Sequence, residues 1–228
     1  MRFLVSILVI LQISLADSFA TAKTTLIQFL QDNPHYQRDF YCNTPFRWVK
    51  NSFQIIPSPS YTPRNRYTKE GKINLRARQI ELEHIMPAHT FGKHLACWKR
   101  GGRRECANDS LFKKMEGDLQ NIVPTIGEIN ADRGNLPFRE APRRWLLNQY
   151  GQCKVYANFK DKEFYPANYS KGWIARSYLY MEKTYKIRLS KTERQLMQRW
   201  DKMYPMDKKE RDFRNFLRVQ KMQKLMRF

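Results

Sequence analysis

The stretch Glu81-Leu82-Glu83-His84-Ile85-Met86-Pro87-Ala88 decides the fold and the chemistry expected of this chain. It places the carboxylate of Glu83 beside the imidazole of His84, just ahead of a proline that ends regular structure. The later part of residues 72–85 alternates imperfectly between apolar and polar side chains, which predicts a strand running into this pair. The pair alone is a weak signal, because a lone histidine is more often structural or solvated.

A second stretch, Asp118-Leu119-Gln120-Asn121-Ile122-Val123-Pro124, adds an amide side chain. Asn121 stands where a helix is expected to start, and Pro124 is tolerated in a first helical turn. The oxygens of Glu83 and Asn121 are hard ligands that suit Mg²⁺, which also keeps several waters. A neutral imidazole at His84 can deprotonate a water beside such an ion. Together the two stretches predict metal-assisted hydrolysis.

The charge of the chain indicates the substrate. A formal net charge of +21 over 228 residues raises the local concentration of polyanions and speeds their encounter. We therefore expect nucleic acid, although membrane-active and heparin-binding proteins are also basic. The hydrophobic fraction of 42% argues against a disordered chain.

Residues 1–20 have the features of a secretory signal peptide. Arg2 supplies the basic end, and Phe3–Ile13 form a mostly apolar stretch. Ser18-Phe19-Ala20 offers a cleavage site with small residues, and Ser14-Leu15-Ala16 offers a second one. The apolar stretch is short for a membrane span. We therefore expect cleavage and a periplasmic or secreted protein without stable membrane insertion.

Four cysteines in an exported chain predict two disulfides, for which three connectivities exist. The Gly101-Gly102 turn between Cys97 and Cys106 lets that pair close locally, which leaves Cys42 for Cys153. The spacings lack any C-x-x-C pair, and an oxidising compartment disfavours free thiols. A Cys₄ zinc site is therefore disfavoured.

Three histidines, His84, His89 and His94, are each five residues apart. Five residues turn a helix through about 500°, so neighbouring members would not share a face. The H-E-x-x-H zinc pattern is also absent. A tri-histidine zinc site is therefore disfavoured.

Helical periodicity dominates the second half of the chain. We expect residues 21–228 to form one α+β domain, mostly helical, with a small strand element around the site. Helices are predicted over residues 110–119, 142–150, 171–185 and 208–228. Two further helices are predicted to start at Asn121 and at Leu189, the latter with Ser190 as a possible cap. Residues 55–63 are predicted to form a loop.

Several motifs follow one another along the chain: Glu83–Ala88, Phe91-Gly92, Cys97-Trp98, Gly101-Gly102-Arg103, Met115–Asn135, Tyr150–Cys153, Ile174–Arg176 and Trp200–Pro205. In identity, order and approximate spacing they resemble the bacterial endonuclease I family. Members of that family are secreted or periplasmic non-specific nucleases with a ββα-metal (His-Me finger) active site. The resemblance covers nearly the whole chain after the signal peptide.

The resemblance implies a role for each matching residue. It makes Glu83 and Asn121 the ligands of Mg²⁺ (Mn²⁺ or Ca²⁺ can occupy the same site), His84 the general base, and Arg103 a phosphate contact. It implies a ββα-metal core surrounded by helices. The implied activity is endonucleolytic hydrolysis of DNA, and of RNA, to 5′-phosphate products. We expect a monomer that binds through phosphates, without base specificity.

The chain also departs from the family pattern. Leu82 stands where members often have Trp, and Cys42 is followed by Asn43-Thr44 rather than by Gly and a second Cys. The last ten residues are not covered by the resemblance. Two other readings stay open: a secreted, non-catalytic nucleic-acid-binding protein, and a cationic membrane-active protein acting through its C-terminal helix.

Overall fold

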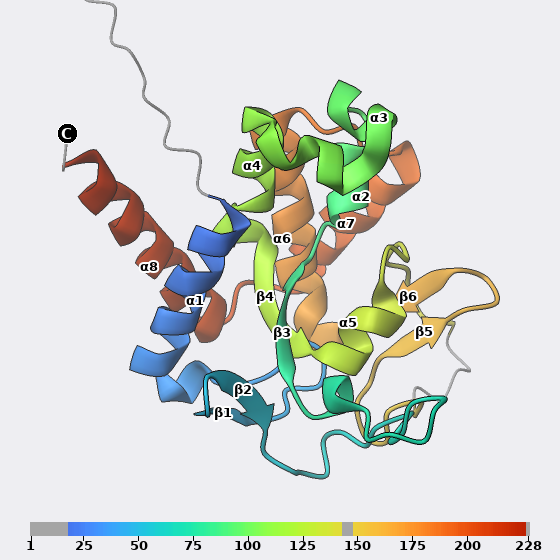
Figure 1. Cartoon of the computed structure of the whole chain (residues 1–228). Helices are drawn as coiled ribbons and strands as arrows, with labels where there is room; N and C mark the ends of the chain where they lie inside the picture. The colour runs from blue at the N-terminus through green and yellow to red at the C-terminus, as the bar shows by residue number, and fades with distance from the viewer. Residues whose placement is uncertain (1–17, 143–147, 227–228) are drawn as a thin grey trace, which may run out of the picture.

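The computed structural model describes residues 18–142 and 148–226. Within these ranges the chain forms eight α-helices and three two-stranded antiparallel sheets, in agreement with the predicted α+β class. The β3–β4 sheet lies among the helices, and the other two sheets lie at the edge of the molecule (Figure 1). The helices are α1 (Phe19–Asp32), α2 (Ala88–Gly92), α3 (Ala96–Glu105), α4 (Ser110–Glu116), α5 (Gly127–Arg133), α6 (Asn168–Tyr185), α7 (Lys191–Met203) and α8 (Lys208–Leu225). The strands are β1 (Phe46–Val49), β2 (Ser52–Ile55), β3 (Ile80–His84), β4 (Ile122–Ile126), β5 (Tyr156–Asn158) and β6 (Glu163–Tyr165). Short 3₁₀ turns cover Pro34–Tyr36, Leu75–Ala77, Cys106–Asn108 and Leu119–Asn121.

The central unit consists of β3, β4 and α5. The two strands are antiparallel, and His84 at the end of β3 lies opposite Ile122 at the start of β4. Helix α5 begins directly after β4 and packs against β3 (Figure 1). Gly127 permits this close start, because a Cβ there would lie 2.7 Å from Oε1 of Glu81. The strand–strand–helix order therefore places one face of β3 against α5.

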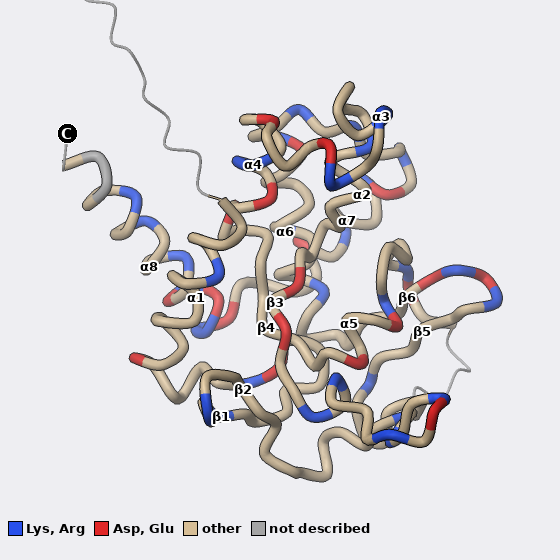
Figure 2. Tube along the Cα trace, viewed as in Figure 1, with Lys and Arg blue, Asp and Glu red and all other residues tan. Residues whose placement is uncertain are grey.

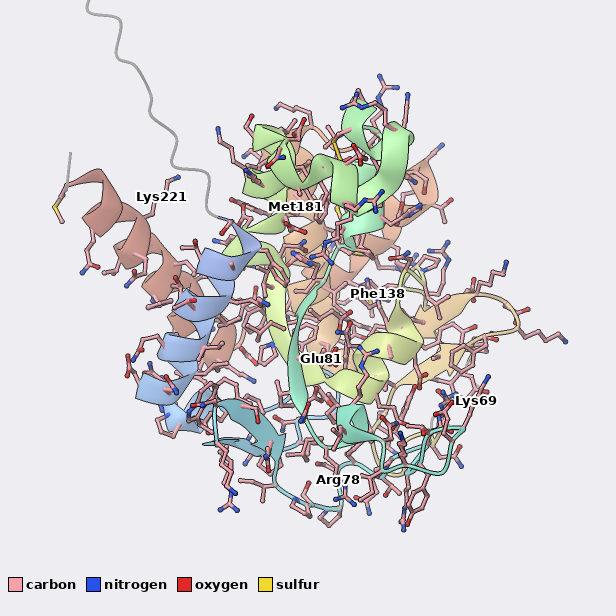
Figure 3. All side chains as sticks on the ribbon, viewed as in Figure 1. Lys69, Arg78, Glu81, Phe138, Met181 and Lys221 are labelled. Carbon is pink, nitrogen blue, oxygen red and sulfur yellow. A yellow bond between two sulfur atoms is a disulfide. The ribbon has the colours of Figure 1, made fainter. Side chains whose placement is uncertain are left out.

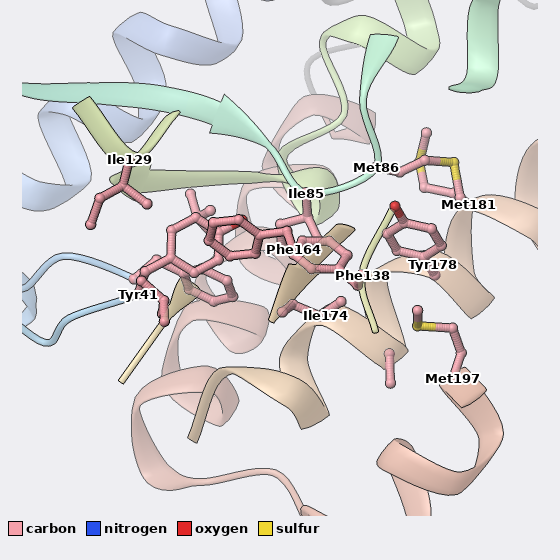
Figure 4. Close-up of a cluster of buried hydrophobic side chains, with 14 of the residues drawn as sticks. Tyr41, Ile85, Met86, Ile129, Phe138, Phe164, Ile174, Tyr178, Met181 and Met197 are labelled. Carbon is pink, nitrogen blue, oxygen red and sulfur yellow. The ribbon is translucent and has the colours of Figure 1, made fainter. Parts of the chain in front are cut away.

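The main hydrophobic core involves the central unit, α6 and α7. Figure 4 shows large buried side chains from these elements and from the segments that cross them. Truncating one such side chain to alanine typically costs about 2–5 kcal/mol. The labelled residues are Tyr41, Ile85, Met86, Ile129, Phe138, Phe164, Ile174, Tyr178, Met181 and Met197.

A second cluster of buried side chains joins α1 to α8, which lie side by side in Figure 1. Helix α1 buries Ala22, Leu26 and Phe29, which lie on one helical face because they are spaced by four and three residues. Phe29 packs on Phe213 of α8 with ring centroids 5.3 Å apart. This packing fixes where α1 begins relative to the central unit.

The two disulfides join Cys42 to Cys153 and Cys97 to Cys106, which confirms the predicted pairing. The first links positions 111 residues apart, and the second closes a segment of only nine. The short bridge closes the segment that carries the Gly101-Gly102 turn.

The prediction of a helix starting at Asn121 was wrong. Asn121 ends a 3₁₀ turn, and the next five residues form β4 instead. A short, mostly apolar run such as Ile122–Ile126 can be a buried strand or a helix by pattern alone. Pairing with β3 decides for the strand here, and Pro124 takes a place opposite Leu82.

Other predicted helices are confirmed, with shifted ends. Helices α4, α6 and α8 correspond to those predicted over 110–119, 171–185 and 208–228, and Ser190 caps α7 by accepting from the Glu193 amide. Most of the helix predicted over 142–150, and most of the predicted signal peptide, lie outside the described residues. In the described part of the chain, no helix is both long enough and apolar enough to cross a membrane.

Candidate active site

His84 is held in one orientation at the end of β3. Its Nε2 lies 2.7 Å from the backbone carbonyl oxygen of Glu116, at the end of α4. A carbonyl only accepts hydrogen bonds, so this contact requires the proton on Nε2 and leaves Nδ1 as an acceptor. His84 is 8% exposed, and burial lowers its pKa to about 4. The carbonyl of Glu116 opposes that shift, and the charges of Arg103 and Arg133 add to it. The imidazole is therefore neutral at pH 7, as a general base must be.

Glu83 is buried beside this histidine, at 4% exposure. Its Oε1 accepts hydrogen bonds from Nη1 of Arg133 at 2.9 Å and from the hydroxyl of Tyr41 at 3.2 Å. Its Oε2 has no hydrogen-bond partner, which is rare for a buried polar atom. Burial raises the pKa of Glu83 to about 7, against the opposing effects of Arg133 and Tyr41. Oε2 is therefore an acceptor that a cation could satisfy.

Arg133 ties α5 to the end of β3. Its side chain is 1% exposed, and Nη1 also donates to the carbonyl of His84 at 3.0 Å. Nη2 donates to the carbonyl of Ile85. The ion pair that Arg133 makes therefore holds the Glu83 carboxylate in place.

The side-chain amide of Asn121 is not oriented toward Glu83 and His84 as a metal ligand should be, because it binds the backbone of Met86. It is fully buried, its Oδ1 accepts from the Met86 amide at 2.7 Å, and its Nδ2 donates to the Met86 carbonyl at 3.0 Å. Both ends of the amide therefore bind the backbone that follows β3. The prediction that Asn121 is a metal ligand disagrees with this geometry.

Asn130 of α5 is the amide that faces β3. Its Nδ2 donates to Oε2 of Glu81 at 2.7 Å, one strand repeat from Glu83. Glu81 also receives two hydrogen bonds from Arg76, at 2.7 and 2.6 Å. Alternate strand residues share a face, so Glu81 and Glu83 both point toward α5. Figure 3 labels Glu81 on β3. Residues 130 and 133 are three apart on α5, which places Asn130 on the same side of the helix as Arg133, whose guanidinium binds the Glu83 carboxylate.

Arg103 lies close to His84 and is half exposed. It follows the break in α3 at Gly101-Gly102, where Gly102 has a φ of +70° that favours glycine. Its Nε donates to Oε1 of Glu116 at 2.6 Å, and its side chain is 52% exposed. Glu116 therefore orients both residues, His84 through its backbone and Arg103 through its carboxylate. The spacing of the sequence motifs contains no signal for this role.

The candidate ligands at this site, a carboxylate oxygen of Glu83 and the amide oxygen of Asn130, are oxygen donors, which suit Mg²⁺ better than zinc. In residues 18–142 and 148–226, no group of three or more His, Cys, Asp or Glu side chains is placed to hold a metal ion. Mg²⁺ is commonly bound by one or two carboxylates and completes its shell with water. The four cysteines are in disulfides, as expected for a chain without a Cys₄ site.

Comparison with known proteins gives the family. The family model described as Endonuclease I matches residues 18–224. The chain belongs to the endonuclease I family. It is 38% identical over 200 residues to a periplasmic deoxyribonuclease of Aeromonas hydrophila, an alignment covering 87% of this chain and 79% of that protein. It is 39% identical over 196 residues to an extracellular deoxyribonuclease of the same organism (84% and 80%). It is 41% identical over 166 residues to Endonuclease-1 of Buchnera aphidicola subsp. Baizongia pistaciae (72% and 65%).

Family membership confirms the resemblance read from the motifs. The relatives named periplasmic or extracellular agree with the predicted export, so this member of the endonuclease I family is periplasmic or secreted. Its predicted site residues fall into two groups in the structure. Glu83, His84 and Arg103 surround the end of β3, whereas Asn121 supports the backbone behind them.

Proposed function

We propose that this protein is a Mg²⁺-dependent endonuclease that hydrolyses phosphodiester bonds of DNA, and also of RNA, without base specificity. The observation that carries the proposal is the pairing of two groups at the end of β3. His84 is neutral with Nε2 fixed by the Glu116 carbonyl, and the neighbouring Glu83 keeps one buried carboxylate oxygen without a partner.

The residues between β3 and α5 fit a metal ion. Glu83 supplies a carboxylate oxygen, and Asn130 replaces Asn121 as the amide on the same face. When bound, Mg²⁺ would stabilise the negative charge that develops as the bond to the leaving 3′ oxygen breaks. Mn²⁺ or Ca²⁺ can occupy the same oxygen ligands. The strand–strand–helix unit then corresponds to the ββα-metal core implied by the resemblance.

The side chains perform the remaining steps. Nδ1 of His84 accepts a proton from the attacking water as that oxygen bonds to phosphorus. The bond between phosphorus and the 3′ oxygen breaks, and solvent protonates that leaving oxygen. One product therefore ends in a 3′-hydroxyl and the other keeps the phosphate on its 5′ oxygen. The exposed guanidinium of Arg103 binds the phosphate and offsets its charge.

Substrate binding is expected to be electrostatic. Contacts to phosphates give affinity but carry no sequence information, so a chain of net charge +21 would bind any duplex. Figure 2 shows Lys and Arg spaced along α8 toward the C-terminus. Figure 3 labels Lys221 on this helix and Lys69 on the opposite side of the molecule. The basic side chains of α8 offer a track for the phosphate backbone, and the same contacts are available in RNA. We propose that the protein acts as a monomer.

Digestion of a supercoiled plasmid tests the proposal. Cleavage should stop in EDTA and return when Mg²⁺ or Mn²⁺ is added in excess. End-labelling of the products should find 5′-phosphates. A protein that binds the plasmid but leaves it intact with either metal would be a non-catalytic nucleic-acid-binding protein.

A further inference from the structure

Phe19, the first residue of α1, lies against the proposed catalytic residues. Its ring centroid is 4.5 Å from that of His84, and the guanidinium carbon of Arg103 is 5.4 Å from the same ring centroid. Phe91 of α2 contacts the imidazole with a T-shaped geometry at 5.7 Å. The imidazole is therefore held by Phe19, Phe91 and the Glu116 carbonyl.

Ser18 fixes the residue that starts α1. Its hydroxyl accepts a hydrogen bond from the Thr21 amide at 3.2 Å, and its carbonyl accepts one from the Ala22 amide at 2.9 Å. Replacing such a cap by alanine weakens the start of a helix. Downstream, Ala22 and Leu26 anchor the helix in the cluster shared with α8. The position of Phe19 thus depends on a capped helix whose far side is packed.

The two cleavage sites suggested by the sequence have different consequences for this contact. Cleavage after Ala20 would remove Ser18 and Phe19, and it would place a positively charged amino group on the first turn of α1. A positive charge there opposes the helix dipole. Cleavage after Ala16 would keep both residues. Ser14 and Ala16 are small enough for the two positions that signal peptidase requires, and so are Ser18 and Ala20, so this requirement does not distinguish the two sites. The part of the chain that matches the family begins at Ser18, so it includes both the cap and the Phe19 ring.

We propose that the export signal is cut after Ala16, and that Phe19 of the resulting protein is a positioning residue that holds the His84 imidazole for catalysis. The second part rests on the proposed role of His84. Phe19 excludes water from one side of the ring and limits its rotation, so Nδ1 stays aimed at the attacking water while Nε2 stays on the Glu116 carbonyl. Residues 17–20 thus belong to the enzyme and not to its signal.

The processing site is tested on protein exported from cells that express the full chain. N-terminal sequencing and intact mass should find a protein that begins at Asp17. A protein that begins at Thr21 and cleaves DNA would overturn the proposal, because it lacks Phe19. This measurement does not depend on the identity of the general base.

The positioning role is tested in the chain that begins at Asp17. Misplacing a catalytic group by about 1 Å can cost 10²-fold in rate, so Phe19→Ala should lower kcat by about tenfold or more with DNA affinity unchanged. Phe19→Leu restores apolar cover over the imidazole and should recover most of the rate. Thr24→Ala is the matched control: it removes an exposed hydroxyl that donates to the Ala20 carbonyl in the same part of α1, but it keeps both the cap and the ring, so it should leave kcat near that of the parent. Equal kcat for Phe19→Ala and Thr24→Ala would contradict the positioning role.

A double-mutant comparison separates this inference from the proposed function. If Phe19 acts through His84, then Phe19→Ala should cause no further loss of rate in a His84→Ala background. A second loss of the same size would show that Phe19 acts elsewhere and would overturn the inference alone. A His84→Ala protein with full activity would instead overturn the proposed function.

Discussion

Arg133 is the charged side chain whose removal should destabilise the protein most. It is 1% exposed and donates to Oε1 of Glu83 and to the carbonyls of His84 and Ile85. Its guanidinium also lies 4.5 Å from the ring centroid of Phe138. Removing one partner of a buried ion pair typically costs about 3–5 kcal/mol. Here Glu83 would have to take up a proton, because its pKa is about 7 even beside Arg133, and the carbonyls of His84 and Ile85 would lose their donor. Arg133→Met keeps much of the apolar volume and should therefore lower the free energy of unfolding by about 3–5 kcal/mol.

Urea unfolding at pH 7 measures this loss. Arg76→Met is the matched control, because Arg76 makes a two-bond pair with Glu81 on the same strand but is 49% exposed. Exposed pairs typically contribute about 1 kcal/mol or less. A loss at Arg133 no larger than that at Arg76 would refute the reasoning.

The double variant Glu83→Leu/Arg133→Met distinguishes stability from function. Replacing both partners of a buried ion pair by apolar residues is often neutral or stabilising. The double variant should therefore be more stable than Arg133→Met alone, and it should still lack activity because Glu83 is absent.

Three further predictions follow from the same structure. Asn130→Ala should weaken the activation of cleavage by Mg²⁺ with little loss of stability, which a Mg²⁺ titration of the cleavage rate measures. Asn121→Ala should mainly lower Tm in a thermal melt, because it removes two hydrogen bonds to the Met86 backbone. Reduction of both disulfides should destabilise the protein, by roughly 2–3 kcal/mol for the short loop and 4–5 for the long one in the chain-entropy model, as measured by urea unfolding with and without reductant. The double variant Arg218→Ala/Lys221→Ala on α8 should make the slope of log DNA affinity against log salt concentration shallower. The change should be roughly 0.9 for each phosphate that the variant no longer neutralises. The control variant Lys69→Ala should leave that slope unchanged.

The sequence predicted the elements whose pattern is local. Ser190 caps α7 because a hydroxyl at that position satisfies the Glu193 amide. The close pairing of Cys97 with Cys106 followed from a Gly-Gly turn between them. Glu83 and His84 could be proposed as site residues because they adjoin each other at the end of a predicted strand, shortly before a proline.

Contacts that join distant segments were beyond prediction from one sequence. The run from Ile122 to Ile126 is apolar enough for either a helix or a strand, and only its pairing with β3 selects the strand. Asn121 and Asn130 are both amides near the expected site, and their backbone and carboxylate partners distinguish them. Glu116 acts on His84 through its carbonyl, a group that every residue carries.

The central claim is that His84 is the general base, and single-turnover cleavage of a short DNA duplex in Mg²⁺ tests it most directly. His84→Ala should lose on the order of 10²-fold or more in rate while binding DNA as tightly as the parent protein, because a base acts in the transition state. His89→Ala is the matched control; that histidine contacts Trp98, with ring centroids 6.0 Å apart, and should not be needed for proton transfer. A His84→Ala protein that cleaves at the parental rate, or a His89→Ala protein that loses the rate instead, would contradict the account.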